Sequence, residues 1–196
     1  MGRHETPAAC KIEIYTQKER KCTGLKISIN AGHTKAGAGS GAAYKGFNEG
    51  AITRAVAATL TAQLRKAGHT VYSSTVNSAP SQNAYLKEVC RLANRTDAEL
   101  VISLHCNASA AHTGHGVECW TWKGRKVPAA VKTCKNLEAL GFKNRGVKDG
   151  SGFYVVKNTK ATAVLVELFF LDNEKDRALY KKHGADKIAA AIAASI

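Results

Sequence analysis

The sequence predicts an α/β fold: a single-domain, three-layer sandwich with a twisted, mostly parallel sheet of about six strands and helices on both faces. Strand-like and helix-like segments alternate from Leu25 to the C-terminus. The runs LVISL (100–104) and AVLVEL (163–168) are almost continuously apolar, which is typical of parallel strands covered on both sides. The 196 residues, 44% of them apolar, suit one domain with a full core.

Three strands and two helices are expected in the first half of the chain. Residues 25–31 form an apolar strand, and a loop rich in Gly, Ser and Ala follows at 32–41. Glu49–Lys66 has the apolar periodicity of an amphipathic helix, and Gly68 suits its C-cap. The further elements are strands at 69–74 and 99–105 and a helix at Gln82–Asn94.

The second half of the chain continues the alternation. Apolar runs predict strands at 117–122 (VECWTW), 152–156 (GFYVV) and 162–170 (TAVLVELFF). Helices are expected at 127–140 and 173–196, the latter amphipathic and rich in Ala near its end. No internal repeat and no second domain is evident, so residues 25–196 are predicted to be one domain.

Residues 1–24 are interpreted as an N-terminal appendage of unassigned role. They are polar and mixed in charge, and their run KIEIY alternates like an edge strand. The six Cys include no CxxC pair, which argues against a zinc ribbon. Reduced, partly buried thiols are the expectation, although Cys10 and Cys22 could bridge outside the cell.

The chain is strongly basic. Lys and Arg number 29 against 15 Asp and Glu, a formal net charge of +14, and ten of these cations against two acids fall between Trp120 and Lys160. Such an excess favours a polyanionic partner, either nucleic acid, an anionic membrane or the anionic bacterial wall. The alternative is a solvated basic surface without a docking role.

Several partner classes lack sequence support. No zinc finger, dense basic recognition helix or RNA-binding aromatic motif is present, which argues against nucleic acid. No run approaches the roughly 20 apolar residues of a membrane helix, so no membrane insertion is expected. The N-terminus lacks the apolar core of a signal peptide. We therefore expect synthesis in the cytoplasm and, for any substrate outside, release by another agent.

Polar residues cluster where strands end, which is where ligands bind in open α/β sheets. His33 follows the first strand, His105 ends the strand at 99–105, and Glu49 opens the first helix. Two imidazoles and a carboxylate are a zinc ligand set that leaves the fourth position open. Glu167 lies inside an apolar strand, where an unpaired carboxylate is costly and a raised pKa suits proton transfer.

Position alone does not decide these assignments. A lone His at a strand end is commonly just a loop residue, and Glu49 suits a helix start for the dipole alone. His112 and His115 lie three apart in AHTGHG and could bind metal as a pair. The other competing imidazoles are His4, His69 and His183.

Five motifs follow one another from about Lys26 to the C-terminus: NAGHTKAGAGSGA, FNEGAITRAVAATLTAQLRKAGHTV, RLANRTDAELVISLHCNAS, GVECW and NRGVKDGSGFYVVKNTKATAVLVELFFLDNEKD. In this order they resemble the zinc-dependent N-acetylmuramoyl-L-alanine amidases (type-3 amidases), and most of all the catalytic domains of phage endolysins. The five motifs in register are far more specific than any one of them alone.

The resemblance implies a site and a reaction. It implies His33, Glu49 and His105 as ligands of one Zn²⁺ and Glu167 as catalytic acid/base. The implied reaction is hydrolysis of the amide that joins N-acetylmuramic acid to the L-alanine of the stem peptide. Cys106 departs from the pattern, since the family commonly has Ala there; its side chain is expected to point to the face opposite His105.

The implied role is that of a peptidoglycan hydrolase, most simply a phage endolysin for host lysis that acts on the cell wall after release. Peptidoglycan and anionic wall polymers are then the expected partners. Two alternatives remain: a host autolysin or spore-release amidase with the same chemistry, and a non-catalytic wall-binding module that kept the fold. A binder has no need of all four site residues, which argues against the second.

Overall fold

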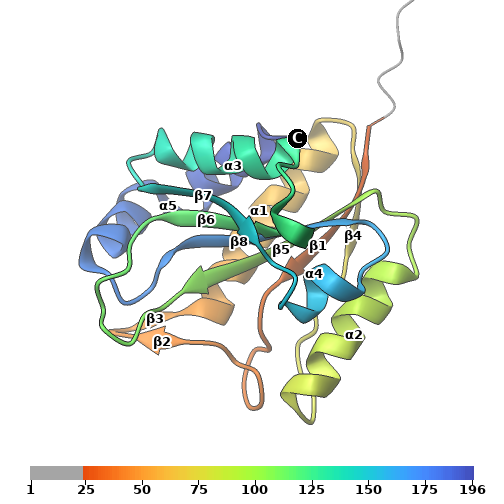
Figure 1. The fold of residues 1–196 in the computed structure, drawn as a ribbon, viewed down its shortest axis with the longest axis horizontal. Helices are drawn as coiled ribbons and strands as arrows, with labels where there is room; N and C mark the ends of the chain where they lie inside the picture. Colours follow the sequence, from red (N-terminus) through yellow and green to blue (C-terminus); the bar gives the residue numbers. More distant parts are fainter. Residues whose placement is uncertain (1–23) are drawn as a thin grey trace, which may run out of the picture.

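The computed structural model describes residues 24–196 and places them around one six-stranded sheet with the order β4-β1-β5-β8-β6-β7 (Figure 1). Strands β4, β1, β5 and β8 are mutually parallel. Strands β6 and β7 are parallel to each other, and β6 runs antiparallel to β8. The sheet strands are β1 (Lys26–Ala31), β4 (Thr70–Ser73), β5 (Leu100–Asn107), β6 (Val117–Thr121), β7 (Asn144–Asp149) and β8 (Thr162–Phe170).

Helices cover both faces of this sheet, which confirms the predicted three-layer architecture. Figure 1 shows α3 on one side of the sheet and α2 and α4 on the other. On the first side, α5 packs against both α1 and α3. The helices are α1 (Glu49–Lys66), α2 (Gln82–Asn94), α3 (Pro128–Glu138), α4 (Tyr154–Asn158) and α5 (Glu174–Ala193), with a 3₁₀ turn η1 (Trp122–Gly124).

Alternate residues of the central strands enter different layers. Ile102, Leu104 and Cys106 of β5 belong to the large core beneath α1, whereas Val101 packs with α2 in a second, smaller cluster. This period of two places His105 on the side of the sheet that faces α2 and α4. The site described below therefore lies on that side.

The prediction of a strand at 152–156 is wrong. These residues lead into α4, and the outer strand is β7, formed by the charged segment NRGVKD. The helix packs against both β8 and α2, and it buries Val155 and Val156. Packing therefore overrides the strand propensity of this β-branched and aromatic run.

Two local features shape the approach to the site. A hairpin that the sequence did not predict, β2 (Ala43–Tyr44) with β3 (Phe47–Asn48), precedes α1. Asn48 caps α1 by accepting the N–H of Ala51 at 2.9 Å, so Glu49 is the first residue of the helix.

The other expected elements are found with their ends shifted by a few residues. The last helix, expected at 173–196, is interrupted at Gly184, whose φ of 66° is non-helical. None of the helices within residues 24–196 is long and apolar enough to span a membrane. The expected KIEIY strand and the possible Cys10–Cys22 bridge lie outside the described residues.

Candidate metal centre and active site

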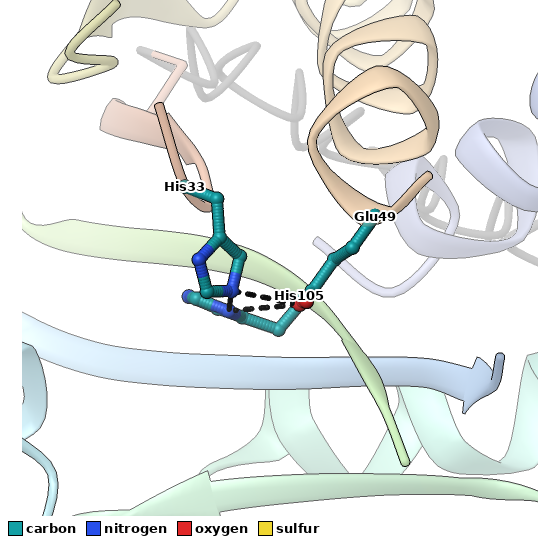
Figure 2. A group of neighbouring side chains, drawn as sticks. All are labelled: His33, Glu49 and His105. Atoms are coloured by element: carbon teal, nitrogen blue, oxygen red, sulfur yellow. Dashed lines mark hydrogen bonds and ion pairs between the residues drawn. The ribbon is translucent and has the colours of Figure 1, made fainter. Parts of the chain in front are cut away.

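Three side chains that are far apart in sequence converge at the carboxyl end of the sheet. Figure 2 shows His33, Glu49 and His105 pointing toward one another. Glu49 Oε1 lies 3.0 Å from His33 Nε2 and 3.3 Å from His105 Nδ1, and the two imidazole nitrogens are 3.2 Å apart. Within residues 24–196 this is the only group of three or more potential ligands whose donor atoms all lie within 4.8 Å of one another.

Glu49 is buried and held at both carboxylate oxygens. Oε1 accepts the backbone N–H of Cys106 and Oε2 accepts that of Ala42, each at 2.9 Å. Burial alone raises the pKa of this carboxyl, but hydrogen bonds from His105 and His33 outweigh it and hold the pKa well below its usual range. The group is therefore a fixed anion between two imidazoles, as a cation site requires.

The backbone and ring of His33 are both fixed by neighbours. Its N–H donates to Tyr85 Oη at 2.7 Å, and its carbonyl accepts from Arg54 at 2.9 Å. These contacts hold a residue whose φ is 71°, a region that L-residues rarely adopt. The ring Nδ1 donates to the carbonyl of Gly39 at 3.0 Å, so Nε2, the nitrogen that faces Glu49, is the one that can bind a metal in place of its proton.

Glycines make room for the two imidazoles. A Cβ on Gly32 would lie 2.5 Å from His105 Cε1, and one on Gly41 would lie 2.7 Å from His33 Cγ and 2.9 Å from Glu49 Oε2. At both positions the backbone lies so close to an imidazole ring that any side chain would overlap it, so only glycine fits.

Glu167 lies beside His105 in the sheet. The two residues are direct partners in the parallel register of β5 and β8. The Glu167 side chain is 9% exposed, and its Oε2 has no hydrogen-bond partner. Burial, with the nearby carboxylates of Glu49 and Glu118 adding to it, raises the pKa of Glu167 to about 8.

A cavity of about 460 Å³ opens over these groups. His33, Glu49, His105 and Glu167 all line it, and Phe153, at the start of α4, lines its wall. The cavity thus brings a potential metal site and a carboxyl that can exchange a proton near neutral pH into one open space. All four predicted site residues lie together here.

The competing imidazoles within the described residues are engaged elsewhere. His112 Nδ1 contacts Asp172 at 2.8 Å, and His183 Nε2 donates to the carbonyl of Leu140 at 2.8 Å. His69 Nδ1 accepts the N–H of Leu25. His115 does not join His112 in a group of three ligands within residues 24–196, and His4 lies outside this range.

The cysteines within the described residues match the expectation of free, buried thiols. Cys90, Cys106, Cys119 and Cys134 are free and buried. The thiol of Cys106 packs in the core beneath α1, on the face opposite His105. Its backbone N–H, rather than its sulfur, serves the site by binding Glu49.

One buried acid beside the site was missed by the sequence analysis. Glu118 of β6 is 2% exposed and pairs with Glu167 across the β6–β8 register. The signal was present, because Glu118 is an acid in the strand run VECWTW, as Glu167 is in VLVELFF. Gly32 and Gly41 carried no such signal, since their role depends on a three-dimensional approach.

The family model of N-acetylmuramoyl-L-alanine amidases (Amidase_3) matches residues 27–196. The chain belongs to this family. The catalytic domain of the CD27L endolysin, which targets Clostridia difficile, is 32% identical with a TM-score of 0.79, over 87% of this chain and 96% of that domain. The resemblance and the fold class predicted from the sequence are thereby confirmed.

Curated relatives from bacteria and from a phage are similar to this amidase domain. LytC of Bacillus subtilis, named an N-acetylmuramoyl-L-alanine amidase, is 29% identical over 95% of this chain and 38% of its own length. The endolysin of Bacillus phage SPP1 is 30% identical over 80% of this chain and 58% of its own length. The chain thus spans about half the length of the curated relatives that it matches.

Substitution of Gly41 by Ala is expected to weaken metal binding roughly tenfold or more, because the added Cβ displaces the His33 ring and the Glu49 carboxylate. Gly46→Ala is a matched control: Gly46 has φ of 81°, close to the 82° of Gly41, but nothing lies within 4 Å of its Cβ position. Both variants carry the same backbone strain. Titration with zinc against a chromophoric chelator measures the difference, and equal losses in both variants would refute the steric argument.

The raised pKa of Glu167 predicts a pH-dependent stability difference in the metal-free protein. Between the ordinary carboxyl pKa and about 8, the folded state keeps a proton that the unfolded state has lost, so wild-type stability falls as pH rises through this window. Glu167→Gln removes this titration. After chelator treatment, the melting temperature of Glu167→Gln minus that of the wild type should increase from pH 5 to pH 9; a constant difference would contradict the burial of an ionisable carboxyl.

Proposed function

We propose that this chain is a zinc-dependent N-acetylmuramoyl-L-alanine amidase that hydrolyses the amide between N-acetylmuramic acid and the L-alanine of the stem peptide. The observation that carries the proposal is the convergence of three metal-type donors beside a buried carboxyl in one cavity. Membership of the amidase family supports the substrate class. The domain division proposed with it is an appendage at 1–24 and a catalytic domain at 25–196.

The donor set fits zinc. His33 Nε2, Glu49 Oε1 and His105 Nδ1 would hold the ion, and three protein ligands with N and O donors are the pattern of catalytic zinc sites. Hard cations such as Mg²⁺ and Ca²⁺ prefer oxygen ligands alone. When bound, zinc lowers the pKa of a coordinated water and polarises a carbonyl. Side chains of this protein carry out the proton transfers of the reaction.

Glu167 is the proposed acid/base. Its Oε2 has no hydrogen-bond partner and lies in the cavity wall, so it is free to accept a proton from the attacking water. A pKa of about 8 makes both transfers feasible near neutral pH, because the group neither holds nor releases a proton too strongly. It then donates this proton to the alanine nitrogen as the amide bond breaks.

The first test identifies the bond that is cleaved and its metal requirement. Purified Gram-positive cell walls are expected to lose turbidity with new free amino groups and no new reducing sugar. Chelation should abolish this release and zinc should restore it. Reducing ends would identify a glycosidase and refute the proposal; walls that bind the protein without any release would point to the non-catalytic module.

Glu167→Gln is expected to lower kcat by at least about 10²-fold, the usual contribution of a positioned general acid/base, and to leave one zinc bound per chain. Glu174→Gln is the matched control, since Glu174 is an exposed acid at the start of α5. Amino-group release and metal content are measured on both variants. Substantial turnover by Glu167→Gln would exclude Glu167 as the acid/base.

Anionic wall polymers are the second proposed partner. Lys123, Arg125 and Lys126 are exposed around η1, so they are available to a polyanion. Arg145 and Lys148, which the sequence grouped with them, instead bind the buried Glu118. Binding of wall polymers is therefore assigned to the exposed cations near η1.

Replacement of Lys123, Arg125 and Lys126 by Gln is expected to weaken wall binding roughly tenfold at low salt and to flatten its salt dependence, because exposed charges act through a screened field. Lys66, Lys175 and Lys182, exposed residues of α1 and α5, provide a control triple variant with the same loss of charge. Co-sedimentation with walls at increasing NaCl is the measurement. Equal weakening by both triple variants would show that net charge matters and the η1 surface does not.

A phage endolysin for host lysis is the favoured biological role, and a host autolysin or spore-release amidase is the second candidate. The match over 96% of the CD27L endolysin catalytic domain supports the first, and the similarity to LytC supports the second. The genes beside the coding sequence distinguish them: holin and capsid genes would support the endolysin, whereas sporulation or division genes would refute it.

A further inference from the structure

Glu118 is the third member of a row of ionisable side chains across the sheet. It lies directly opposite Glu167 in the antiparallel register of β6 and β8, and Glu167 lies opposite His105 in the parallel register of β8 and β5. Neighbouring strands are about 4.8 Å apart. The Glu118 side chain therefore leaves the sheet one strand away from the proposed acid/base, on the same face.

Two cations share one oxygen of this carboxylate. Arg145 Nε donates to Glu118 Oε2 at 2.5 Å and Lys148 Nζ donates to the same atom at 2.6 Å. The other oxygen accepts from Asn107 Nδ2 at 2.8 Å. One cation is enough to neutralise Glu118, so the cluster carries a net charge of +1.

The second cation is difficult to explain by stability alone. A buried ion pair is poor evidence for stability even when it is balanced, and here two like charges are held against one acid. The side chains of Arg145 and Lys148 remain 28% and 33% exposed. The guanidinium of Arg145 lies over the Phe170 ring, 4.8 Å from its centre. Within residues 24–196 its terminal nitrogens donate no hydrogen bond, and only Nε is engaged by Glu118, so the terminal nitrogens can donate to a ligand.

Two aromatic rings, those of Trp120 and Phe153, lie between these cations and the cavity. Lys148 Nζ lies 5.3 Å from the centre of the Trp120 ring, and the Trp120 and Phe153 rings are 5.1 Å apart. Phe153 lines the cavity that contains Glu167. A peptide that leaves the cavity over β6 therefore meets apolar ring surface and then positive charge.

We propose that Arg145 and Lys148, held side by side on Glu118, form a subsite for the free carboxylate of the stem-peptide residue that follows the L-alanine. An extended chain advances about 3.5 Å per residue, which is comparable with the single strand spacing between Glu167 and Glu118. The carboxylate would accept charge-assisted hydrogen bonds and balance the net charge of the cluster. This assignment rests on the proposed function, because it takes Glu167 as the reacting end.

The test uses two soluble muramoyl tripeptides whose second residue is a glutamate joined to the third residue through its side-chain carboxyl. The α-carboxyl of this glutamate is free in one substrate and amidated in the other. For Lys148→Met, kcat/KM on the free acid should fall roughly 10- to 100-fold, mostly through KM, as expected for the loss of a hydrogen bond between charged groups. On the amide it should change less than about threefold. Glu118 keeps Arg145 as a partner in this variant, which protects the fold.

Two further variants separate recognition from structure. Lys148→Arg keeps a cation and should keep most of the preference for the free acid. Lys143→Met removes the same charge from an exposed residue just before β7, the strand that carries Lys148, and it should leave the preference unchanged. Equal losses on both substrates in Lys148→Met, or no preference in the wild type, would overturn the subsite.

Direct binding distinguishes failure of the subsite from failure of the proposed function. The two free tripeptides, without the sugar, are titrated calorimetrically into the zinc-loaded wild type and into Lys148→Met. The wild type should bind the free acid at least about tenfold more tightly than the amide, and the variant should not discriminate. If neither muramoyl substrate is cleaved, the proposed amidase activity is wrong, while this titration still supports or overturns the carboxylate subsite.

Discussion

The buried carboxylate of Glu49 is the interaction on which the site depends. It stands at the first turn of α1, accepts backbone N–H groups from the preceding loop and from β5, and contacts both imidazoles. Loop, helix and strand are thus joined at one anion. Because a buried charge is costly unless it is paired and hydrogen-bonded, the chain can bury Glu49 only in the arrangement that also orients His33 and His105.

Two neighbouring glutamates show how environment assigns different roles to the same side chain. Glu118 accepts hydrogen bonds from three donors, two of which are cations, whereas Glu167, its register partner, has an oxygen without any partner. Burial therefore raises the pKa of Glu167 to about 8, and Glu118 is tied to its cations. Separating the environments of two adjacent carboxyls is a general way to obtain one proton carrier and one fixed charge.

The order and direction of the strands bring most of the site residues together. Parallel strands β1 and β5 end at the same edge, so the residues that follow or end them meet there. Reversal of β6 and β7 relative to β8 brings Glu118, Trp120 and their cation partners onto the adjoining surface. The described domain matches almost the whole of the CD27L catalytic domain but about half of the curated relatives, so the similarity concerns only part of each of those longer proteins.

The sequence by itself determined the layered α/β architecture, because apolar periodicity is a local property. The cost of an acid in an apolar strand singled out Glu167, whereas the assignment of His33, Glu49 and His105 depended on the resemblance of five ordered motifs. It failed at GFYVV, where local strand propensity favours β structure but packing of Val155 and Val156 selects a helix. Only the tertiary structure decided that Glu118 faces Glu167, that Arg145 and Lys148 converge on one oxygen, and that Gly32 and Gly41 clear space for the imidazoles. These relations depend on strand order and on contacts between distant segments, which a single sequence does not encode in any local pattern.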